Sequence, residues 1–258
     1  MAATVFFLNP LPAVGGTAVL DGKEGHHAAT VRRIRVGERI VLSDGEGGIA
    51  ETVVTGVERE RLEMTVEARM EAARPSPTVG LVQALPKAER SELAVELATE
   101  AGIDSIVPWQ SSRCVARWEG PKAVKGVTRW RGVVAAASKQ SRRAYVPEVA
   151  ELHSTADVLK RVRAVVDRGG IVAVLHESAA EKFSALKFRE VAEVLLVVGP
   201  EGGIDDKEIA KLTEAGAVPV LLGPTVLRTS TAAAVALGAI GVLTDRWNHA
   251  PLNFGSPE

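Results

Sequence analysis

Short hydrophobic runs with a period of two dominate the first 72 residues. "ERIVLSDG" and "IAETVVTGVE" flank the turn sequence "DGEGG", and "RLEMTVEARM" continues the alternation. A period of two is typical of half-buried strands, and Asp-Gly and Gly-Gly pairs favour tight turns. We therefore predict a small β barrel or sandwich over residues 1–72. A linker is predicted over residues 73–77, where two prolines lie within three residues.

The pattern changes beyond the linker, where continuous apolar runs alternate with helical periodicity. Continuous runs are typical of parallel strands buried on both faces. Residues 78–258 are therefore predicted to form an α/β domain with a mostly parallel sheet. The predicted strands are "VGLVQAL" (79–85), "DSIVPW" (104–109), "IVAVLHE" (171–177), "VLLVVGPEGG" (194–203) and "VPVLLG" (218–223).

Helix signals fill the intervals between these strands. Helices are predicted over 88–101, with Leu93, Leu97 and Ala101 on one face, over 124–139, and from Thr229 onward. Glycines that follow the periodic residues, Gly102 and Gly216, are expected to end helices. Asp205 and Glu208 have the spacing of a capping box at a further helix start.

Composition excludes several classes of protein. The chain has 258 residues, 46% of them hydrophobic, and a formal net charge of −1. Its one cysteine permits no internal disulfide and fits a reducing cytoplasm. We expect no signal peptide, because the N-terminus lacks a basic segment, and no membrane span, because the longest apolar stretch is too short. The five histidines have no metal-ligand spacing, so no metal site is expected.

Positive charge is concentrated in the middle of the chain. Between residues 113 and 143 nine basic residues stand against one acidic residue, Glu119. Such a block can neutralise phosphates, and Trp118 and Trp130 within it could stack on bases. The alternative is a solvated helix face with both tryptophans in the core. The nine are Arg113, Arg117, Lys122, Lys125, Arg129, Arg131, Lys139, Arg142 and Arg143.

Three predicted strands end in polar or glycine-rich turns. These are "LHES" (175–178), "GPEGG" (199–203) and "LGPTVLRTST" (222–231). Ligands of open α/β sheets bind beyond the carboxyl ends of the strands, so these turns are candidate ligand loops. Neither a phosphate-binding lysine loop nor a dinucleotide fingerprint is present. His176 beside Glu177 fits either acid–base chemistry or a structural histidine.

Two longer segments around these turns resemble a known family. "LLVVGPEGGIDDKEI" (195–209) and "LLGPTVLRTSTAAAVAL" (221–237) are similar to the C-terminal signature of SPOUT methyltransferases of the RsmE type, which methylate uracil N3 in 16S ribosomal RNA. Matches upstream occur in the same order: "HHAATVRRIRVGERIVLSDGEGG" (26–48), "ELATEAGIDSIVPWQSSRC" (96–114) and "AAASKQSRRAYVPEV" (135–149). The resemblance therefore covers nearly the whole chain.

The resemblance implies a fold and a set of partners. The fold is a PUA-like β domain followed by an α/β domain with a C-terminal trefoil knot at about residues 195–235. The implied cofactor is S-adenosylmethionine, the implied partners are 16S rRNA in the small ribosomal subunit and a second copy of the chain, and the implied location is the cytoplasm. The implied cofactor-binding residues are Leu175, His176, Gly199, Gly202, Gly203, Leu222, Gly223, Leu227, Ser230 and Ala232. The implied RNA-binding residues are Arg32, Arg33, Arg35, Arg113, Gln140 and Arg143.

Methylation of uracil N3 requires in-line positioning and loss of the N3 proton. We expect Arg228 to stabilise the developing imidate charge; a salt bridge within the knot is its structural alternative. Glu201 is a candidate base, although a glutamate in a tight turn can instead accept backbone hydrogen bonds.

The chain departs from the family pattern in four places. Ser230 and Lys139 stand where the family usually has glutamate, Leu97 replaces a usual lysine, and "LHES" (175–178) lacks a basic residue that is common after that strand. Three alternatives remain at the level of sequence. One is a SPOUT enzyme of another specificity, acting on a ribose 2′-oxygen or on tRNA. The second is a non-catalytic RNA-binding protein. The third is a small-molecule enzyme of the doubly wound type, which would leave the basic block unexplained.

Overall fold

The computed structural model describes residues 5–248, with only the backbone at residues 88 and 89. Its contacts divide the chain into two compact units. Among the described residues the first, here called the β unit, comprises residues 5–74 and 138–146. The second, the α/β unit, comprises residues 75–137 and 147–248. The β unit thus includes a segment that lies more than sixty residues further along the chain.

The β unit is built on one five-stranded sheet with the order β1-β3-β4-β5-β2. β1 runs parallel to β3, and every other neighbouring pair is antiparallel. A short helix α1 (Gly22–His26) and a π-helical turn (His27–Val31) follow β2. The strands are β1 (Val5–Phe7), β2 (Thr17–Leu20), β3 (Arg39–Ser43), β4 (Gly48–Glu58) and β5 (Arg61–Glu71).

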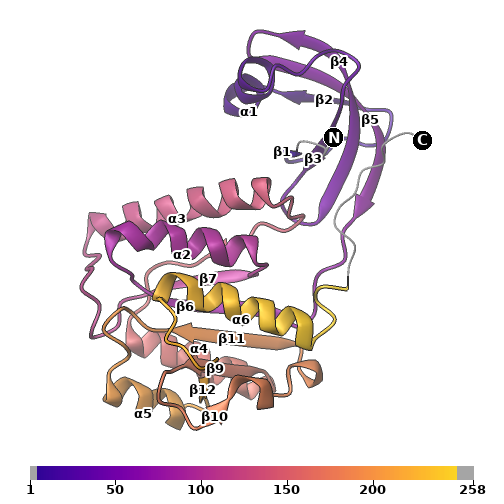
Figure 1. Ribbon diagram of the computed structural model, residues 1–258. Coiled ribbons are helices and arrows are strands. Elements are labelled where there is room, and N and C mark those ends of the chain that lie inside the picture. Colours follow the sequence, from indigo (N-terminus) through magenta and orange to yellow (C-terminus); the bar gives the residue numbers. More distant parts are fainter. Residues whose placement is uncertain (1–4, 249–258) are drawn as a thin grey trace. The chain divides into compact units, whose positions relative to one another are not determined.

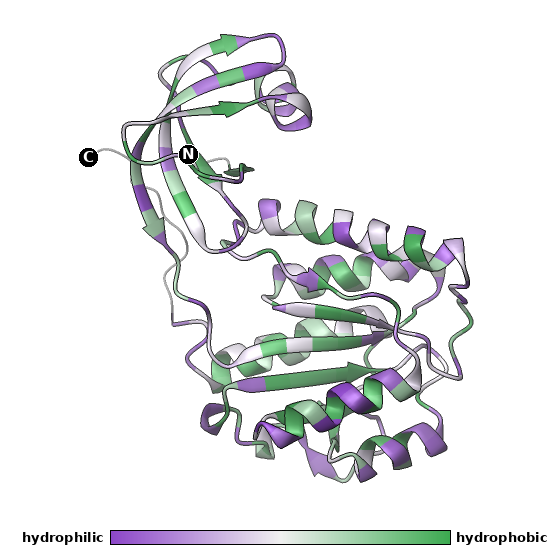
Figure 2. Ribbon diagram, turned by 180° about the vertical axis from the view of Figure 1, so that it is seen from behind, coloured by the Kyte–Doolittle hydropathy of each residue, from purple (hydrophilic) through white to green (hydrophobic). Residues whose placement is uncertain are grey.

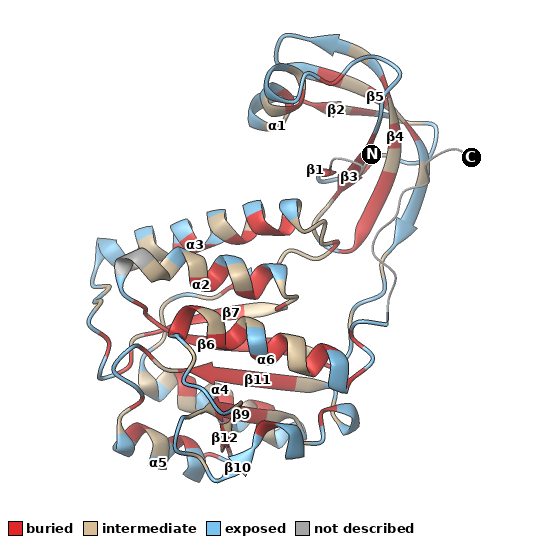
Figure 3. Cartoon of the chain, viewed as in Figure 1, coloured by how far each residue is buried: buried red, intermediate tan, exposed pale blue. Residues whose placement is uncertain are grey.

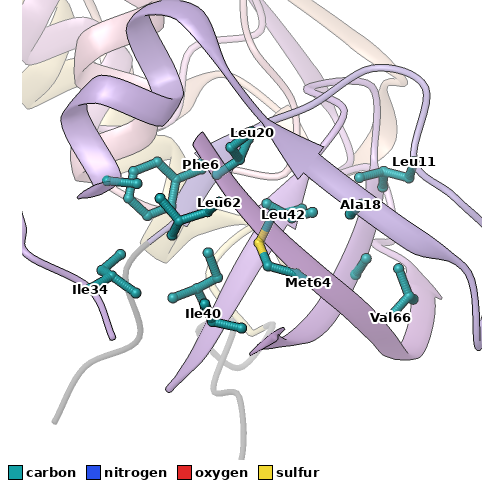
Figure 4. Packing of buried hydrophobic residues seen from close by; sticks show 13 residues of the cluster. Phe6, Leu11, Ala18, Leu20, Ile34, Ile40, Leu42, Leu62, Met64 and Val66 are labelled. Atoms are coloured by element: carbon teal, nitrogen blue, oxygen red, sulfur yellow. The ribbon is translucent and has the colours of Figure 1, made fainter. Parts of the chain in front are cut away.

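The alternating residues of these strands form two apolar clusters. Phe6, Leu42 and Met64 are fully buried in the larger one (Figure 4). Tyr145, from segment 138–146, packs against the smaller one, and its Oη donates a 2.8 Å hydrogen bond to the carbonyl oxygen of Ala72. Gly47 leaves the space that the Tyr145 ring fills. The period-two pattern thus predicted β3, β4 and β5, whereas the short strands β1 and β2 were not singled out from the sequence.

The α/β unit contains a seven-stranded sheet with the order β10-β12-β9-β11-β6-β7-β8. All of its pairings are parallel, as the continuous apolar runs predicted. Hydrophobic residues follow the central strands (Figure 2). The strands are β6 (Thr78–Ala84), β7 (Ser105–Trp109), β8 (Glu148–Val149), β9 (Ile171–Leu175), β10 (Glu181–Lys182), β11 (Glu193–Val198) and β12 (Val218–Leu221).

Helices cover both faces of this sheet (Figure 1). α2 packs along α6, and α4 and α5 pack on β9 and β12. α3 lies against α2, where Trp130 Nε1 donates a 2.9 Å hydrogen bond to Ser91 Oγ. The helices are α2 (Ala88–Glu100), α3 (Pro121–Gln140), α4 (Thr155–Asp167), α5 (Asp206–Glu214) and α6 (Thr229–Leu243).

Helix α6 contains no charged residue, and its small side chains allow close packing. Ala232, Ala233 and Ala236 are buried against the unit, and Gly241 leaves the space in which the Trp247 ring lies. Beyond the helix, the buried Arg246 pairs with Asp104 at 2.8 Å and also donates to the Pro77 and Gly102 carbonyls. The C-terminal end of the unit is thereby attached to the start of the sheet.

One sequence-based expectation needs correction. Asp205 caps α5 by accepting a hydrogen bond from Lys207 N–H, but Glu208 completes no capping box. Its carboxylate instead accepts hydrogen bonds from other segments, which local spacing does not reveal.

Helix α2 combines buried, intermediate and exposed residues (Figure 3). Val95 and Ala98 are fully buried, whereas Leu93, Leu97 and Ala101, which share one face as predicted, are partly buried.

The two tryptophans of the basic block pack on each other. Trp130 is fully buried, whereas Trp118 is partly buried and lies edge-to-face on it at 5.2 Å between ring centroids. For Trp130 the core alternative is therefore the right one, and Trp118 attaches the loop that leads into α3 to this core.

Candidate functional site

The turns that follow β9, β11 and β12 meet at one cavity of about 660 Å³. The strands are neighbours in a parallel sheet, so their carboxyl ends lie at the same edge. A cavity of this size is typical of small-molecule sites. It is lined by residues 175–178 at the end of β9 and beyond it, by 198–204 around the end of β11, by several residues of 221–232 from the end of β12 onward, and by Arg90, Arg113 and Asp206.

Apolar side chains and bare backbone form much of the wall. Leu175, Leu222 and Leu227 contribute side chains. Gly203 adopts a φ of +73°, which favours glycine, and the space beside Gly223 is open. At Gly199 a Cβ atom would lie 2.6 Å from Ile204 Cγ1, so a larger residue would displace the turn. The wall thus suits a ligand with an apolar, planar part and polar groups that bind backbone atoms.

A buried hydrogen-bond chain holds two of these turns together. Thr229 Oγ1 donates to the carbonyl oxygen of Gly199 at 2.7 Å and accepts from Gln83 Nε2 at 2.9 Å. The neighbouring Ser230 is buried, and its hydroxyl has no hydrogen-bond partner among residues 5–248. Of the ten cofactor-binding residues inferred from the sequence, nine line the cavity, and the buried Ser230 does not.

Arg228 and Glu201 both line the cavity but differ in their contacts. Arg228 is the N-cap residue of α6, and its side chain is exposed. Glu201 Oε1 accepts a 3.0 Å hydrogen bond from Lys87 N–H at the start of α2. This backbone donor belongs to a distant segment and not to the turn itself, and the bond engages Oε1 alone.

Two further polar residues of the predicted set lie at this cavity. Arg113 pairs with Asp205 at 3.3 Å and donates to the carbonyl oxygen of Ile204. His176 Nδ1 accepts a 3.2 Å hydrogen bond from Ser178 N–H, which orders the turn after β9. Arg113 is therefore held on the segment that follows the glycine-rich turn, and the His176 ring supports its own loop.

The other predicted RNA-binding residues belong to the β unit. Arg32, Arg33 and Arg35 are exposed in the segment between the π-helical turn and β3. Gln140 and Arg143 lie in segment 138–146. Next to them, Lys139 binds both carboxylate oxygens of Glu24, at 2.9 and 2.6 Å, and its Nζ lies 4.7 Å from the centre of the Phe6 ring. The unusual lysine therefore forms an internal ion pair with α1.

Sequence reasoning missed Arg90 and the role of Thr229. Arg90 lies in the first turn of α2, after the carboxyl end of β6. Ligands of parallel sheets bind beyond the carboxyl ends of the strands, and β6 is one of these strands. The same rule that indicated the other three turns could therefore have indicated Arg90. Thr229 lies within the quoted "LRTST" segment, but the partner of its hydroxyl is thirty residues away and leaves no local signal.

No helix within residues 5–248 is long and apolar enough to cross a membrane. The same stretch holds no group of three or more His, Cys, Asp or Glu side chains arranged as metal ligands.

A ligand cavity at the carboxyl edge of a parallel sheet is common to many α/β proteins, and sequence comparison identifies the class. Residues 74–241 match the model of the RNA methyltransferase domain, and residues 20–67 match the RNA methyltransferase PUA domain. The chain belongs to this RNA methyltransferase family, with the SPOUT fold and a PUA-like β unit.

Individual relatives extend over almost the whole chain. A Mycobacterium tuberculosis protein named ribosomal RNA small subunit methyltransferase E is 55% identical, covering 96% of this chain and 95% of its own length. The Bacillus subtilis protein of the same name is 32% identical, with coverages of 89% and 91%. A crystal structure of a Neisseria gonorrhoeae protein of that name, bound to S-adenosylmethionine, superposes with a TM-score of 0.84 at 28% identity, covering 94% of this chain and 98% of the other.

Proposed function

We propose that the protein is an S-adenosylmethionine-dependent methyltransferase that modifies N3 of a uridine in 16S rRNA of the small ribosomal subunit. The observation that carries the proposal is the convergence of the three turns on one cavity. Relatives of 55% and 32% identity that span the chain are named as small-subunit rRNA methyltransferases, which supports the substrate class. Action on ribosomes implies a cytoplasmic location.

The cavity fits the cofactor. Its apolar walls, Leu175, Leu222 and Leu227, suit an adenine ring and a methionine side chain, and the glycines allow close approach of backbone N–H groups. We propose that residues of about 195–235 form the knot around it. The residues that would hold the cofactor are Leu175, His176, Gly199, Gly202, Gly203, Leu222, Gly223, Leu227 and Ala232, whereas Ser230 is buried and does not line the cavity.

Bound there, S-adenosylmethionine supplies an electrophilic methyl group on a positively charged sulfur. The chain has to orient the uracil and stabilise the charge that appears when N3 loses its proton. Arg228 is exposed at the cavity, so its guanidinium is available to a uracil carbonyl oxygen that carries imidate charge. Glu201 Oε2 is the candidate acceptor for the N3 proton, while Oε1 holds Lys87 N–H.

Basic residues of both units would bind the RNA backbone. Arg32, Arg33 and Arg35 are exposed in the PUA-like unit, where their charges can neutralise phosphates. Gln140 and Arg143 add polar groups from segment 138–146, and Arg113 adds one at the cavity. Guanidinium groups suit phosphates and base faces alike.

A homodimer is part of the proposal. The outer face of α6 exposes Val235 and Val242, and the helix offers no charged residue to keep that face solvated. A second copy of the chain would cover this outer face of α6, since helices with small residues pack closely against a partner. Replacing Val242 with aspartate should yield a monomer, as measured by light scattering.

The decisive experiment is transfer of a labelled methyl group to small ribosomal subunits that lack their native modification, followed by nucleoside analysis. A 3-methyluridine product is expected. A ribose-methylated product, or transfer to tRNA alone, would assign another specificity. No transfer, together with no heat of cofactor binding, would identify a non-catalytic RNA-binding protein.

A further inference from the structure

Glu208 of α5 is a buried carboxylate with three hydrogen bonds to other segments. Only 7% of the residue is exposed. Its oxygens accept from Ser112 N–H at 3.0 Å, from Ser112 Oγ at 2.9 Å and from Thr155 Oγ1 at 2.6 Å. A carboxylate removed from water is stabilised only by such donors. Removing the carboxylate, or removing its donors, therefore leaves buried polar groups without hydrogen-bond partners.

These bonds join three elements that are distant in sequence. Ser112 lies in the loop after β7, and Thr155 is the first residue of α4. Thr155 Oγ1 also accepts from the indole N–H of Trp109 at 3.2 Å. The carboxylate therefore fixes the loop after β7 relative to α4 and α5.

Ser112 is followed by Arg113, one of the three arginines that line the cavity. Arg113 carries its side chain to Asp205 and Ile204, and a Cβ on Gly202 would lie 3.6 Å from the Arg113 carbonyl oxygen. The Arg113–Asp205 pair is partly exposed, and such pairs contribute little on their own. The backbone attachment through Ser112 is therefore the stronger restraint on where Arg113 stands.

We propose that Glu208 is a positioning residue, which holds the Ser112–Arg113 segment so that Arg113 faces the cavity and meets the RNA. The RNA contact rests on the proposed function, whereas the restraint on the loop does not. Glu208 is not one of the residues that line the cavity, so in this proposal its effect on activity passes through Arg113.

Cys114 offers a readout that requires no activity. It is the one cysteine of the sequence, it is buried in the same loop, and its Sγ lies 3.2 Å from Ser111 Oγ. Burial raises the pKa of the Cys114 thiol, so a thiol reagent reacts only when the loop opens. Glu208→Ala is expected to speed labelling by about tenfold, and Glu208→Gln, which keeps an acceptor for Ser112 N–H, by much less.

Two controls separate loop opening from general loss of stability. Glu214→Ala alters an exposed carboxylate of the same helix and should leave the labelling rate unchanged. Val172→Ala weakens the core around β9 and serves as a general destabilising control. Its rate of Cys114 labelling is compared with that of Glu208→Ala under conditions in which both variants have the same free energy of unfolding. Equal rates for these two variants would overturn the proposal, and faster labelling in Glu208→Ala alone would support it.

A double-mutant cycle with Arg113 tests the link to RNA. Glu208→Ala should lower kcat/KM for the RNA substrate by about tenfold in the natural background and by less than about twofold in Arg113→Ala. The dissociation constant for S-adenosylmethionine, measured by calorimetry without RNA, should stay within about twofold. Equal losses in both backgrounds, or an equal loss of cofactor affinity, would overturn the role through Arg113. An inactive natural protein with the expected Cys114 labelling would overturn only the proposed function.

Discussion

Thr229 Oγ1 donates a 2.7 Å hydrogen bond to the carbonyl oxygen of Gly199, and so the first residue of α6 is attached to the turn that follows β11. Gln83 at the end of β6 completes the chain by donating to the same hydroxyl. Two walls of the cavity are therefore held at a fixed separation by one buried side chain.

Thr229→Val is expected to weaken cofactor binding. Valine keeps the shape of threonine but removes both hydrogen bonds, and the Gly199 carbonyl loses its donor. Loss of about 1.4 kcal/mol would raise the dissociation constant for S-adenosylmethionine about tenfold, as measured by calorimetry. Thr229→Ser should bind nearly as the natural protein does. Thr231→Val is the matched control, because the Thr231 hydroxyl donates to the Arg228 carbonyl oxygen within the same helix turn. Equal effects of the two valine substitutions on cofactor binding would contradict the prediction.

Arg228→Ala is expected to impair transfer more than binding. If the guanidinium stabilises imidate charge that exists only during reaction, kcat falls by about a hundredfold while the cofactor dissociation constant changes little. Single-turnover methyl transfer with saturating cofactor measures the difference. Lys207→Ala removes an exposed cation from α5 and should leave kcat unchanged. A 3-methyluridine product formed at the natural rate by Arg228→Ala would rule out this role.

Arg33→Gly should separate RNA binding from stability in the β unit. Arg33 adopts a φ of +54°, a left-handed conformation that costs about 1 kcal/mol in residues other than glycine. Glycine relieves this cost, so thermal stability should hold or rise. Affinity for a 16S rRNA fragment should fall, and the dependence of log K on log salt should become shallower by about one unit. Unchanged affinity and slope would place Arg33 outside the RNA contact.

Two glycine-to-alanine changes should have opposite effects on stability. At Gly25 a Cβ atom would lie 2.7 Å from the Leu20 carbonyl oxygen and closer still to that of Glu60, so Gly25→Ala should cost about 2 kcal/mol or more. Gly132 is exposed in α3 with open space beside it, and Gly132→Ala should add about 1 kcal/mol. Urea unfolding measures both, and a neutral Gly25→Ala would show that the backbone at α1 can yield.

The cap of α4 should make a pH-dependent contribution to stability. Hydrogen bonds from Ser154, and next from Lys160, lower the pKa of Asp157 from 3.8 to about 2. A carboxyl group with a depressed pKa in the folded state stabilises the fold above its unfolded pKa, and the effect disappears as the pH falls through the folded value. Asp157→Asn should therefore have a lower free energy of unfolding than the natural protein at about pH 6, and this difference should shrink from about pH 4 downward. A difference in the free energy of unfolding that stays constant down to about pH 3 would show that the charge of Asp157 is not its cause.

The sequence predicted the features that depend on neighbours along the chain. The longer strands of both units, the parallel sheet, the helix ends at Gly102 and Gly216 and the start of α6 at Thr229 follow the predicted pattern, whereas the short strands β1, β2, β8 and β10 were not singled out. The grouping of the three turns also followed from the sequence, because parallel strands place their carboxyl ends at one edge. Each of these inferences uses local periodicity or one general rule of sheet geometry.

Only the tertiary structure decided which distant groups meet. Glu208 has the spacing of a helix cap but bonds to Ser112 and Thr155, Tyr145 packs within the β unit, and Arg246 is buried against Asp104. Local spacing predicts which residues share one face of an element, but the fold decides which segment covers that face and which partner a buried polar group finds. Such a group must find a donor or acceptor wherever the chain brings one within reach, because leaving it unpaired away from water costs more than any local preference supplies.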